Sequence, residues 1–183
     1  MPLGGKYALG PQIHDGDSGL VFRATRLSDG RPMIVKLLER AEASLDAQRK
    51  LRVEFEIVSA MPEEAAYVPT ELFESEESLA IVSEDHGHVS LAQWLAQRTP
   101  TLMDSLRVAS AVAGCVARIH SRDVLHGDLS LTNIVVRPDT GAVRLIDFGL
   151  ASVIPRNVAG LSPSAKLEGT LAYMSPERTG RIN

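Results

Sequence analysis

A polar run at residues 126–133 constrains the fold of this chain more than any other feature. It reads His-Gly-Asp-Leu-Ser-Leu-Thr-Asn, so Asp128 and Asn133 lie five residues apart in a loop that leads into a short strand-forming segment. A second such segment follows, and Asp147 stands directly after it. Carboxylate and amide oxygens are ligands that Mg²⁺ prefers in proteins, and a carboxylate can also accept a hydroxyl proton. The pattern therefore indicates a site in which these oxygens hold a metal ion or accept a proton.

This run, together with Asp147-Phe148-Gly149, resembles the catalytic loop and the DFG motif of protein kinases. The resemblance implies that Asp128 orients or deprotonates the acceptor hydroxyl and that Asn133 and Asp147 bind Mg²⁺ ions. A lone Asp-Phe-Gly or His-x-Asp arises easily by chance. The interpretation therefore depends on whether the other kinase elements occur in the required order.

Upstream, residues 14–24 resemble the glycine-rich loop of the same family. Gly16 and Gly19 match two of its glycines, which allow backbone amides to approach phosphates closely. His14 replaces the first glycine, and Val21 matches the valine that covers adenine. The alternative for this segment alone is an ordinary glycine-rich hairpin turn.

Residues 34–36, Ile-Val-Lys, resemble the strand that carries the ATP-binding lysine, which implies that Lys36 contacts the α- and β-phosphates. Alone, Lys36 would be taken for a solubility residue on an edge strand. The family lysine pairs with a carboxylate on the next helix, and Glu54, Glu56 and the neighbouring Arg52 compete for that position. Glu54 is favoured because it matches the ion-pair glutamate of the family, whereas Glu56 is expected in solvent.

Residues 81–85 resemble the run into the hinge, whose backbone hydrogen-bonds adenine. The small Ser83 would guard the back of the nucleotide pocket, which predicts an accessible rear cavity, although an ordinary strand end is the alternative. The nucleotide-contacting residues implied by the resemblance are Gly16, Gly19, Val21, Ile34, Lys36, Ser83, Glu84, His86 and Val135.

Residues 168–177 resemble the substrate-docking loop and the APE motif, so the activation segment would span 147–177. Ser162 and Ser164 are conceivable phosphorylation sites, although exposed loop serines without that role are the commoner case. The sequence of residues 167–183 is similar to that of the N-terminal Ser/Thr-kinase-like domain of large bacterial hybrid sensor histidine kinases.

These elements, in this order, predict an α+β, bilobal protein-kinase-like fold. An N-lobe at 1–84 would hold an antiparallel sheet and one helix at 43–60, followed by a hinge at 85–88 and a mainly helical, incomplete C-lobe at 89–183. The acidic turn at 74–78 is expected to be solvated. Strands are expected around 13–24, 32–38, 70–73, 79–83, 133–137 and 142–146.

Further helices are expected at 91–96 and 101–120, and Thr101 with Asp104 resembles a capping box. Kinases continue past the APE motif with several more helices, so this chain is expected to be a fragment or to be completed by another chain. Part of the apolar surface of the second lobe should then be exposed. The apolar face expected on the 101–120 helix comprises Leu102, Leu106, Ala109, Ala113, Val116 and Ile119.

Composition excludes several function classes. The net charge of −4 argues against a nucleic-acid protein driven by phosphate neutralisation. Cys115 is the only cysteine, which excludes an intramolecular disulfide and a cysteine-cluster metal site and fits a cytoplasmic setting. The longest largely apolar stretch, 108–117, is too short for a membrane span, and no signal peptide is expected.

Three positions depart from the family pattern. Gly127 replaces the arginine that meets a phosphorylated activation loop, so phosphate-gated activation is not expected. Ser130 replaces a lysine near the γ-phosphate, which predicts slow catalysis. Ile34 stands where a small alanine usually contacts adenine, which predicts a tight pocket roof.

The function implied by the resemblance is Mg–ATP-dependent phosphoryl transfer to Ser or Thr hydroxyls of protein. The expected partners are ATP and either a protein substrate or downstream sensor and histidine kinase domains. One alternative is a catalytically weak or dead nucleotide-binding pseudokinase that acts as a scaffold. A second is a small-molecule phosphotransferase of the aminoglycoside or choline type, or the atypical kinase of the tRNA-threonylcarbamoylation complex. Those families generally lack a docking loop like residues 169–177, so this alternative ranks lower.

Overall fold

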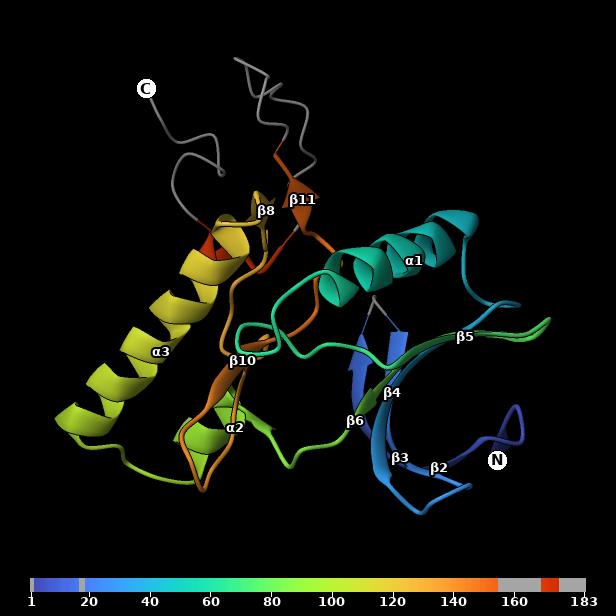
Figure 1. Cartoon of the computed structure of the whole chain (residues 1–183), viewed down its shortest axis with the longest axis horizontal. Helices are drawn as coiled ribbons and strands as arrows, with labels where there is room; N and C mark the ends of the chain where they lie inside the picture. Colours follow the sequence, from blue (N-terminus) through green and yellow to red (C-terminus); the bar gives the residue numbers. More distant parts are fainter. Residues whose placement is uncertain (1, 17–18, 155–168, 175–183) are drawn as a thin grey trace. The chain divides into compact units, whose positions relative to one another are not determined.

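A computed structural model describes residues 2–16, 19–154 and 169–174 of the 183-residue chain. The backbone forms two compact units (Figure 1). The first comprises Met1–Ala60 and Tyr67–Gly87, and the second comprises Met61–Ala66 and His88–Asn183.

The first unit is an antiparallel sheet of six strands and one helix. Its strand order is β1-β2-β3-β4-β6-β5, so that β4 lies near the middle with β3 on one side and β6 on the other. Strand β2 begins at Tyr7, earlier than the expected start at Ile13, and β1 was not expected. The strands are β1 (Pro2–Leu3), β2 (Tyr7–Gly16), β3 (Gly19–Arg26), β4 (Pro32–Glu39), β5 (Glu71–Glu74) and β6 (Ser78–Glu84).

The two faces of this sheet bury different apolar clusters, because successive side chains of a strand point to opposite faces. Met33, Val35 and Leu37 of β4 belong to a cluster with residues of β3, β5 and β6. Leu38 lies on the other face and packs with Leu51 of α1 (Leu45–Ser59). Helix α1 therefore covers one face of the sheet (Figure 1).

Local signals account for the bounds of α1. The Ser44 hydroxyl accepts a hydrogen bond from the amide of Ala47, which caps the first turn. The helix therefore begins at Leu45, two residues after the expected start. The expectation that the turn at 74–78 is merely solvated is wrong for Glu74, whose carboxylate bonds Arg52 of α1 and Arg40.

The described part of the second unit contains two helices, short strands and a 3-10 turn. Strands β10, β9 and β7 form one antiparallel sheet, and β11 pairs with β8. The helices match the expected positions, and the capping box of Thr101 and Asp104 is present. The elements are β7 (Val89–Ser90), α2 (Leu91–Ala96), α3 (Leu102–His120), β8 (Val124–Leu125), β9 (Ile134–Val136), β10 (Val143–Leu145), β11 (Ser152–Val153) and η1 (Leu171–Tyr173).

The apolar face expected on α3 is largely exposed. Cys115 and Ile119 are the buried residues of this helix, whereas Leu102 and Leu106 are 76% and 55% exposed. The expectation of exposed apolar surface in this part of the chain is confirmed by these leucines and by Met103. Among the described helices, none is long and apolar enough to cross a membrane.

Candidate active site

Lys36 and Glu54 form a close ion pair in the first unit. Lys36 Nζ lies 2.7 Å from Glu54 Oε2 and 3.0 Å from Glu54 Oε1. The two side chains are only 12% and 7% exposed. Glu54 shares the buried face of α1 with Leu51 and Val58, which stand three and four residues away at helical spacing. The expected pair is therefore present.

The two competing residues on α1 have other surroundings. Glu56 is exposed, in agreement with the sequence expectation. Arg52 donates to both carboxylate oxygens of Glu74 on β5, at 3.1 and 3.0 Å. The hydrogen bonds from Arg52, the largest cause, and from Arg40 hold the pKa of the Glu74 carboxyl below its usual range.

Four of the predicted nucleotide-contacting residues, one of which is Lys36, lie on the same face of the sheet. Val21 is the cross-strand partner of Lys36, and Ile34 is the partner of Ser83. Direct partners in antiparallel strands share a face, and so do residues two apart on one strand. The register therefore gathers Val21, Ile34, Lys36 and Ser83 on one face. Ser83 is buried, and the predicted rear cavity stays a prediction.

The glycines of the β2–β3 hairpin meet different constraints. Gly16 and Gly19 are the last register pair before residues 17–18, which lie outside the described part of the chain. Gly19 has φ +118°, and a Cβ there would lie 2.7 Å from the Leu37 carbonyl oxygen. Its backbone position therefore requires glycine. A Cβ on Gly16 would instead meet His14 Nε2 at 2.7 Å, so the imidazole that replaces the first glycine of the family pattern lies against Gly16.

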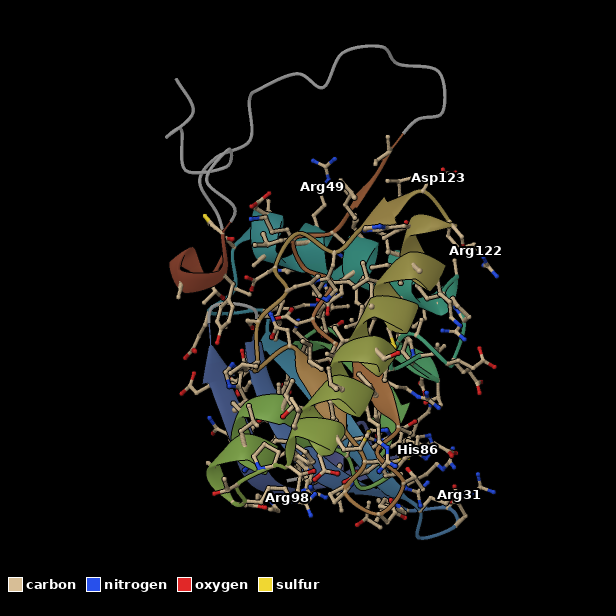
Figure 2. The ribbon with its side chains drawn as sticks, turned by 90° about the vertical axis from the view of Figure 1, so that its left-hand side faces the viewer. Arg31, Arg49, His86, Arg98, Arg122 and Asp123 are labelled. Atoms are coloured by element: carbon tan, nitrogen blue, oxygen red, sulfur yellow. The ribbon has the colours of Figure 1, made fainter. Side chains whose placement is uncertain are left out.

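The last residue of β6, Glu84, is held by two arginine side chains. The Glu84 carboxylate accepts hydrogen bonds from Arg31 and Arg26, at 2.8 and 3.1 Å. These bonds lower the pKa of the Glu84 carboxyl, and the bond from Arg31 has the larger effect on that pKa. Figure 2 shows the side chains of Arg31 and His86, which belong to the first unit.

In the second unit, the Asp128 carboxylate is fixed at both oxygens. The Asn133 side-chain amide donates to Asp128 Oδ2 at 2.9 Å and to the Asp128 backbone oxygen at 3.0 Å. The backbone amide of Thr170 donates to Asp128 Oδ1 at 2.8 Å. An ionised carboxylate has about four lone-pair sites, so the group can still accept a further donor.

Asn133 also fits the role of a metal ligand. Its Nδ2 donates only to Asp128 among the described residues, which orients the Oδ1 atom away from Asp128. The Ile146 amide donates to the Asn133 carbonyl at 2.9 Å, so the backbone of Asn133 lies beside the residue that precedes Asp147. Asp147 has φ 59° and is, with Asp123, one of two non-glycine described residues in the left-handed region. Such strain is frequent at functional sites.

The described residues form no metal site made of acidic, His or Cys side chains alone. Within the described ranges, no group of three or more His, Cys, Asp or Glu side chains is arranged to hold a metal ion. A site formed by Asn133 and Asp147 needs further oxygen ligands from phosphate or water, as Mg²⁺ commonly does. Hard amide and carboxylate oxygens suit that ion, so these residues fit it.

His126 is an important residue that the sequence reasoning did not single out. The ring is buried, packs against Phe148 with centroids 4.6 Å apart, and accepts a hydrogen bond at Nδ1 from the Asp128 amide. The proton must then be on Nε2, which lies 3.0 Å from the Ile146 carbonyl oxygen. Burial lowers the pKa of His126, so the imidazole is neutral. Its position two residues before Asp128 was the available signal.

Two departures from the family pattern have local structural causes. Gly127 has φ +82°, and a Cβ there would lie 2.2 Å from the Leu150 carbonyl oxygen, so an arginine does not fit this backbone. Ser130 is buried, and its hydroxyl bonds Thr132 Oγ1 at 2.8 Å and accepts from the Asn133 amide at 3.3 Å. Ser130 therefore shapes the loop that presents Asn133.

The remaining predicted positions are only partly described. Val135 is buried on β9, and its contact with a nucleotide stays a prediction. Ser162, Ser164 and the APE residues 175–177 lie outside the described residues.

The fold and these groups define a class. An antiparallel sheet with an ion-paired lysine, followed by a helical unit with an Asp–Asn loop and a left-handed aspartate, is the α+β arrangement of a protein-kinase-like fold. A family model, "Protein kinase domain", matches residues 7–182. The chain therefore belongs to the protein kinase family, as the sequence resemblance implied.

Curated relatives agree with this assignment. "Serine/threonine-protein kinase fused" of Drosophila melanogaster is 28% identical over 174 residues, which is 94% of this chain and 21% of that protein. "Probable serine/threonine-protein kinase PkwA" of Thermomonospora curvata is 30% identical over 179 residues, which is 96% of this chain and 23% of that protein. The chain thus spans less than a quarter of the length of these relatives.

Proposed function

We propose that this chain transfers the γ-phosphoryl group of ATP to serine or threonine hydroxyls of a protein. Family membership and the serine/threonine kinase names of its relatives support the reaction class. The observation that carries the proposal is the Asp128 carboxylate, which is held by the Asn133 amide on one oxygen and by the Thr170 amide on the other.

On this proposal each group has a distinct task. Lys36 lies on β4, beside the hairpin that contains Gly16 and Gly19. It is oriented by Glu54 and binds the α- and β-phosphates. Asn133 and Asp147 would hold Mg²⁺, which when bound neutralises charge on the phosphates. Asp128 orients the acceptor hydroxyl and accepts its proton. Positioning, more than covalent chemistry, supplies the rate enhancement in such a reaction.

The test compares Asp128→Asn with Asp139→Asn. Asp139 lies in the exposed turn between β9 and β10 and, among the described residues, pairs only with Arg137, so it is a matched control for charge removal. Transfer of labelled phosphate to a Ser/Thr peptide library should fall at least about 100-fold in Asp128→Asn and stay unchanged in Asp139→Asn. Equal rates in the two variants would remove Asp128 from the mechanism.

A second candidate is a nucleotide-binding scaffold without transfer. The buried Ser130 hydroxyl favours it, because that position supplies loop structure and no cation. Mg–ATP should then raise the melting temperature of the wild-type chain, an effect that Asp147→Asn removes, with no labelled peptide formed. Measurable transfer by the wild type would reject the scaffold.

We also propose a cytoplasmic setting, where ATP is available, and a place in signal transduction. The similarity of residues 167–183 to kinase-like domains of bacterial hybrid sensor histidine kinases supports a partnership with sensor and histidine kinase domains. Phosphorylation of such a purified domain by this chain would test that partnership.

A further inference from the structure

The hydroxyl of Tyr67 bonds two backbone groups of the segment 84–87, which begins with the last residue of β6. Tyr67 Oη donates to the Glu84 carbonyl oxygen at 2.7 Å and accepts from the His86 amide at 2.8 Å. The Tyr67 and His86 rings also lie near each other, with centroids 5.7 Å apart. One phenol therefore satisfies an acceptor and a donor that stand two residues apart.

Other groups fix the same segment from different directions. The Asp85 amide donates to the Pro32 carbonyl at 2.9 Å, as the sheet register continues. The Asp85 side chain pairs with Arg23 and accepts from the Gly87 amide at 2.8 Å. The segment is therefore held in one conformation in which the Glu84 carbonyl and the His86 amide point toward Tyr67.

We propose that Tyr67 competes with the nucleotide base for these two backbone groups and so sets nucleotide affinity. This inference rests on the proposed function and on the sequence resemblance, which implies that Glu84 and His86 contact the nucleotide. An adenine edge offers an amino donor beside a ring-nitrogen acceptor, which are the same two roles that the Tyr67 hydroxyl plays here. A carbonyl oxygen has two lone pairs, but an amide has a single hydrogen. Base binding at His86 therefore requires the Tyr67 hydroxyl to leave.

The proposal predicts opposite effects on stability and affinity. Tyr67→Phe keeps the ring and removes the hydroxyl, so the free protein loses both bonds to the segment and becomes slightly less stable. The nucleotide no longer displaces Tyr67, so affinity rises. The net value of one hydrogen bond in water corresponds to a gain of about twofold to tenfold in affinity.

The experiment measures the dissociation constants of Mg–ATP and of Mg–tripolyphosphate for the wild-type chain and for Tyr67→Phe by calorimetry. Tripolyphosphate has no base, so it reports the phosphate contacts alone. We expect Mg–ATP to bind about twofold to tenfold more tightly to Tyr67→Phe and Mg–tripolyphosphate to bind both proteins equally. Tyr7→Phe is the matched control, because it removes a tyrosine hydroxyl that bonds Glu71 in the same unit.

Each other outcome overturns the inference. Equal or weaker ATP binding by Tyr67→Phe would make Tyr67 a structural clamp and leave the proposed function intact. A gain with both ligands, or a gain in Tyr7→Phe as well, would show a general effect. Folded proteins that bind no ATP would reject the proposed function together with the inference. If Tyr67→Phe does not fold, Tyr67→Leu gives the same comparison with a shorter side chain.

Discussion

Asn133 and Asp128 are joined twice, because one amide nitrogen of Asn133 serves both the backbone oxygen and the carboxylate of Asp128, at 3.0 and 2.9 Å. The loop between them is closed further by the hydrogen bond from the Asn133 backbone amide to the Ser130 hydroxyl. Asn133 thus orients the Asp128 carboxylate. This role is separate from its proposed role as a metal ligand.

Asn133→Ala should therefore affect both stability and transfer. Loss of the donor leaves two partly buried acceptors on Asp128 unpaired, which should lower the free energy of unfolding by about 1–3 kcal/mol. We expect kcat in peptide phosphorylation to fall about 100-fold or more, because the proton acceptor loses its orientation. Asn133→Asp is the informative companion, since it keeps an oxygen ligand but loses the donor. Full kcat in Asn133→Ala would contradict this role.

The sequence was sufficient to predict elements that have strong local signals. The capping box of Thr101 and Asp104 marks the start of α3, and the pattern around Glu54 identified the partner of Lys36. Which residues of α3 are buried could not be predicted, because small and apolar residues occur all around that helix and periodicity did not distinguish its sides. Tertiary packing selected Cys115 and Ile119.

The parts of the site that sequence reasoning missed depend on contacts between distant segments. His126 Nε2 lies 3.0 Å from the Ile146 carbonyl oxygen, and the need for glycine at Gly127 arises from Leu150. The bonds of Tyr67 to Glu84 and His86 likewise join a loop to the end of a strand. Spacing along the chain contains no signal for such contacts.

The Lys36–Glu54 pair predicts a separation of stability from nucleotide binding. Glu54→Gln removes the carboxylate charge 2.7 Å from the nearly buried ammonium of Lys36, which should lower the free energy of unfolding by about 3 kcal/mol. Lys36→Met combined with Glu54→Leu should recover most of that loss, because apolar side chains then replace both charges of the pair. Mg–ATP affinity should be lost in both proteins. Urea denaturation and calorimetry measure the two quantities.

Glu56→Gln is the control for this comparison. Glu56 is exposed on the same helix, so its neutralisation should change the free energy of unfolding by no more than about 0.5 kcal/mol. Equal stabilities of Glu54→Gln and Glu56→Gln would show that the pair contributes nothing.

Gly127 predicts that the arginine of the family pattern cannot be restored. Gly127→Ala must adopt φ +82° and place its Cβ 2.2 Å from the Leu150 carbonyl oxygen, so the backbone has to move. Gly141→Ala is a matched control, because Gly141 has φ +71° with open space around it. The control should cost about 1–2 kcal/mol from φ alone, and Gly127→Ala and Gly127→Arg clearly more. Thermal melts of equal midpoint would contradict the steric argument.

His126 predicts a pH dependence of stability with a defined sign. Burial lowers its folded-state pKa below the usual value of about 6.5, although the Ile146 hydrogen bond and the charges of Asp147 and Asp128 act in the opposite direction. Below about pH 6.5 the unfolded chain binds a proton that the folded chain does not. The contribution of His126 to stability is therefore fully present above pH 6.5 and is lost as the pH falls toward the folded pKa.

The measurement is the free energy of unfolding at pH 7.5 and at pH 5.5, for the wild type and for His126→Gln. The chain has five histidines, so other groups titrate in the same range, and the difference between the two proteins isolates His126. We expect the wild type to lose about 1 kcal/mol more than the variant on acidification, because up to about 1.4 kcal/mol accompanies each unit of pKa difference. An equal loss in the two proteins would mean that His126 titrates alike in the folded and unfolded chains, and that burial beside Phe148 does not hold the imidazole neutral.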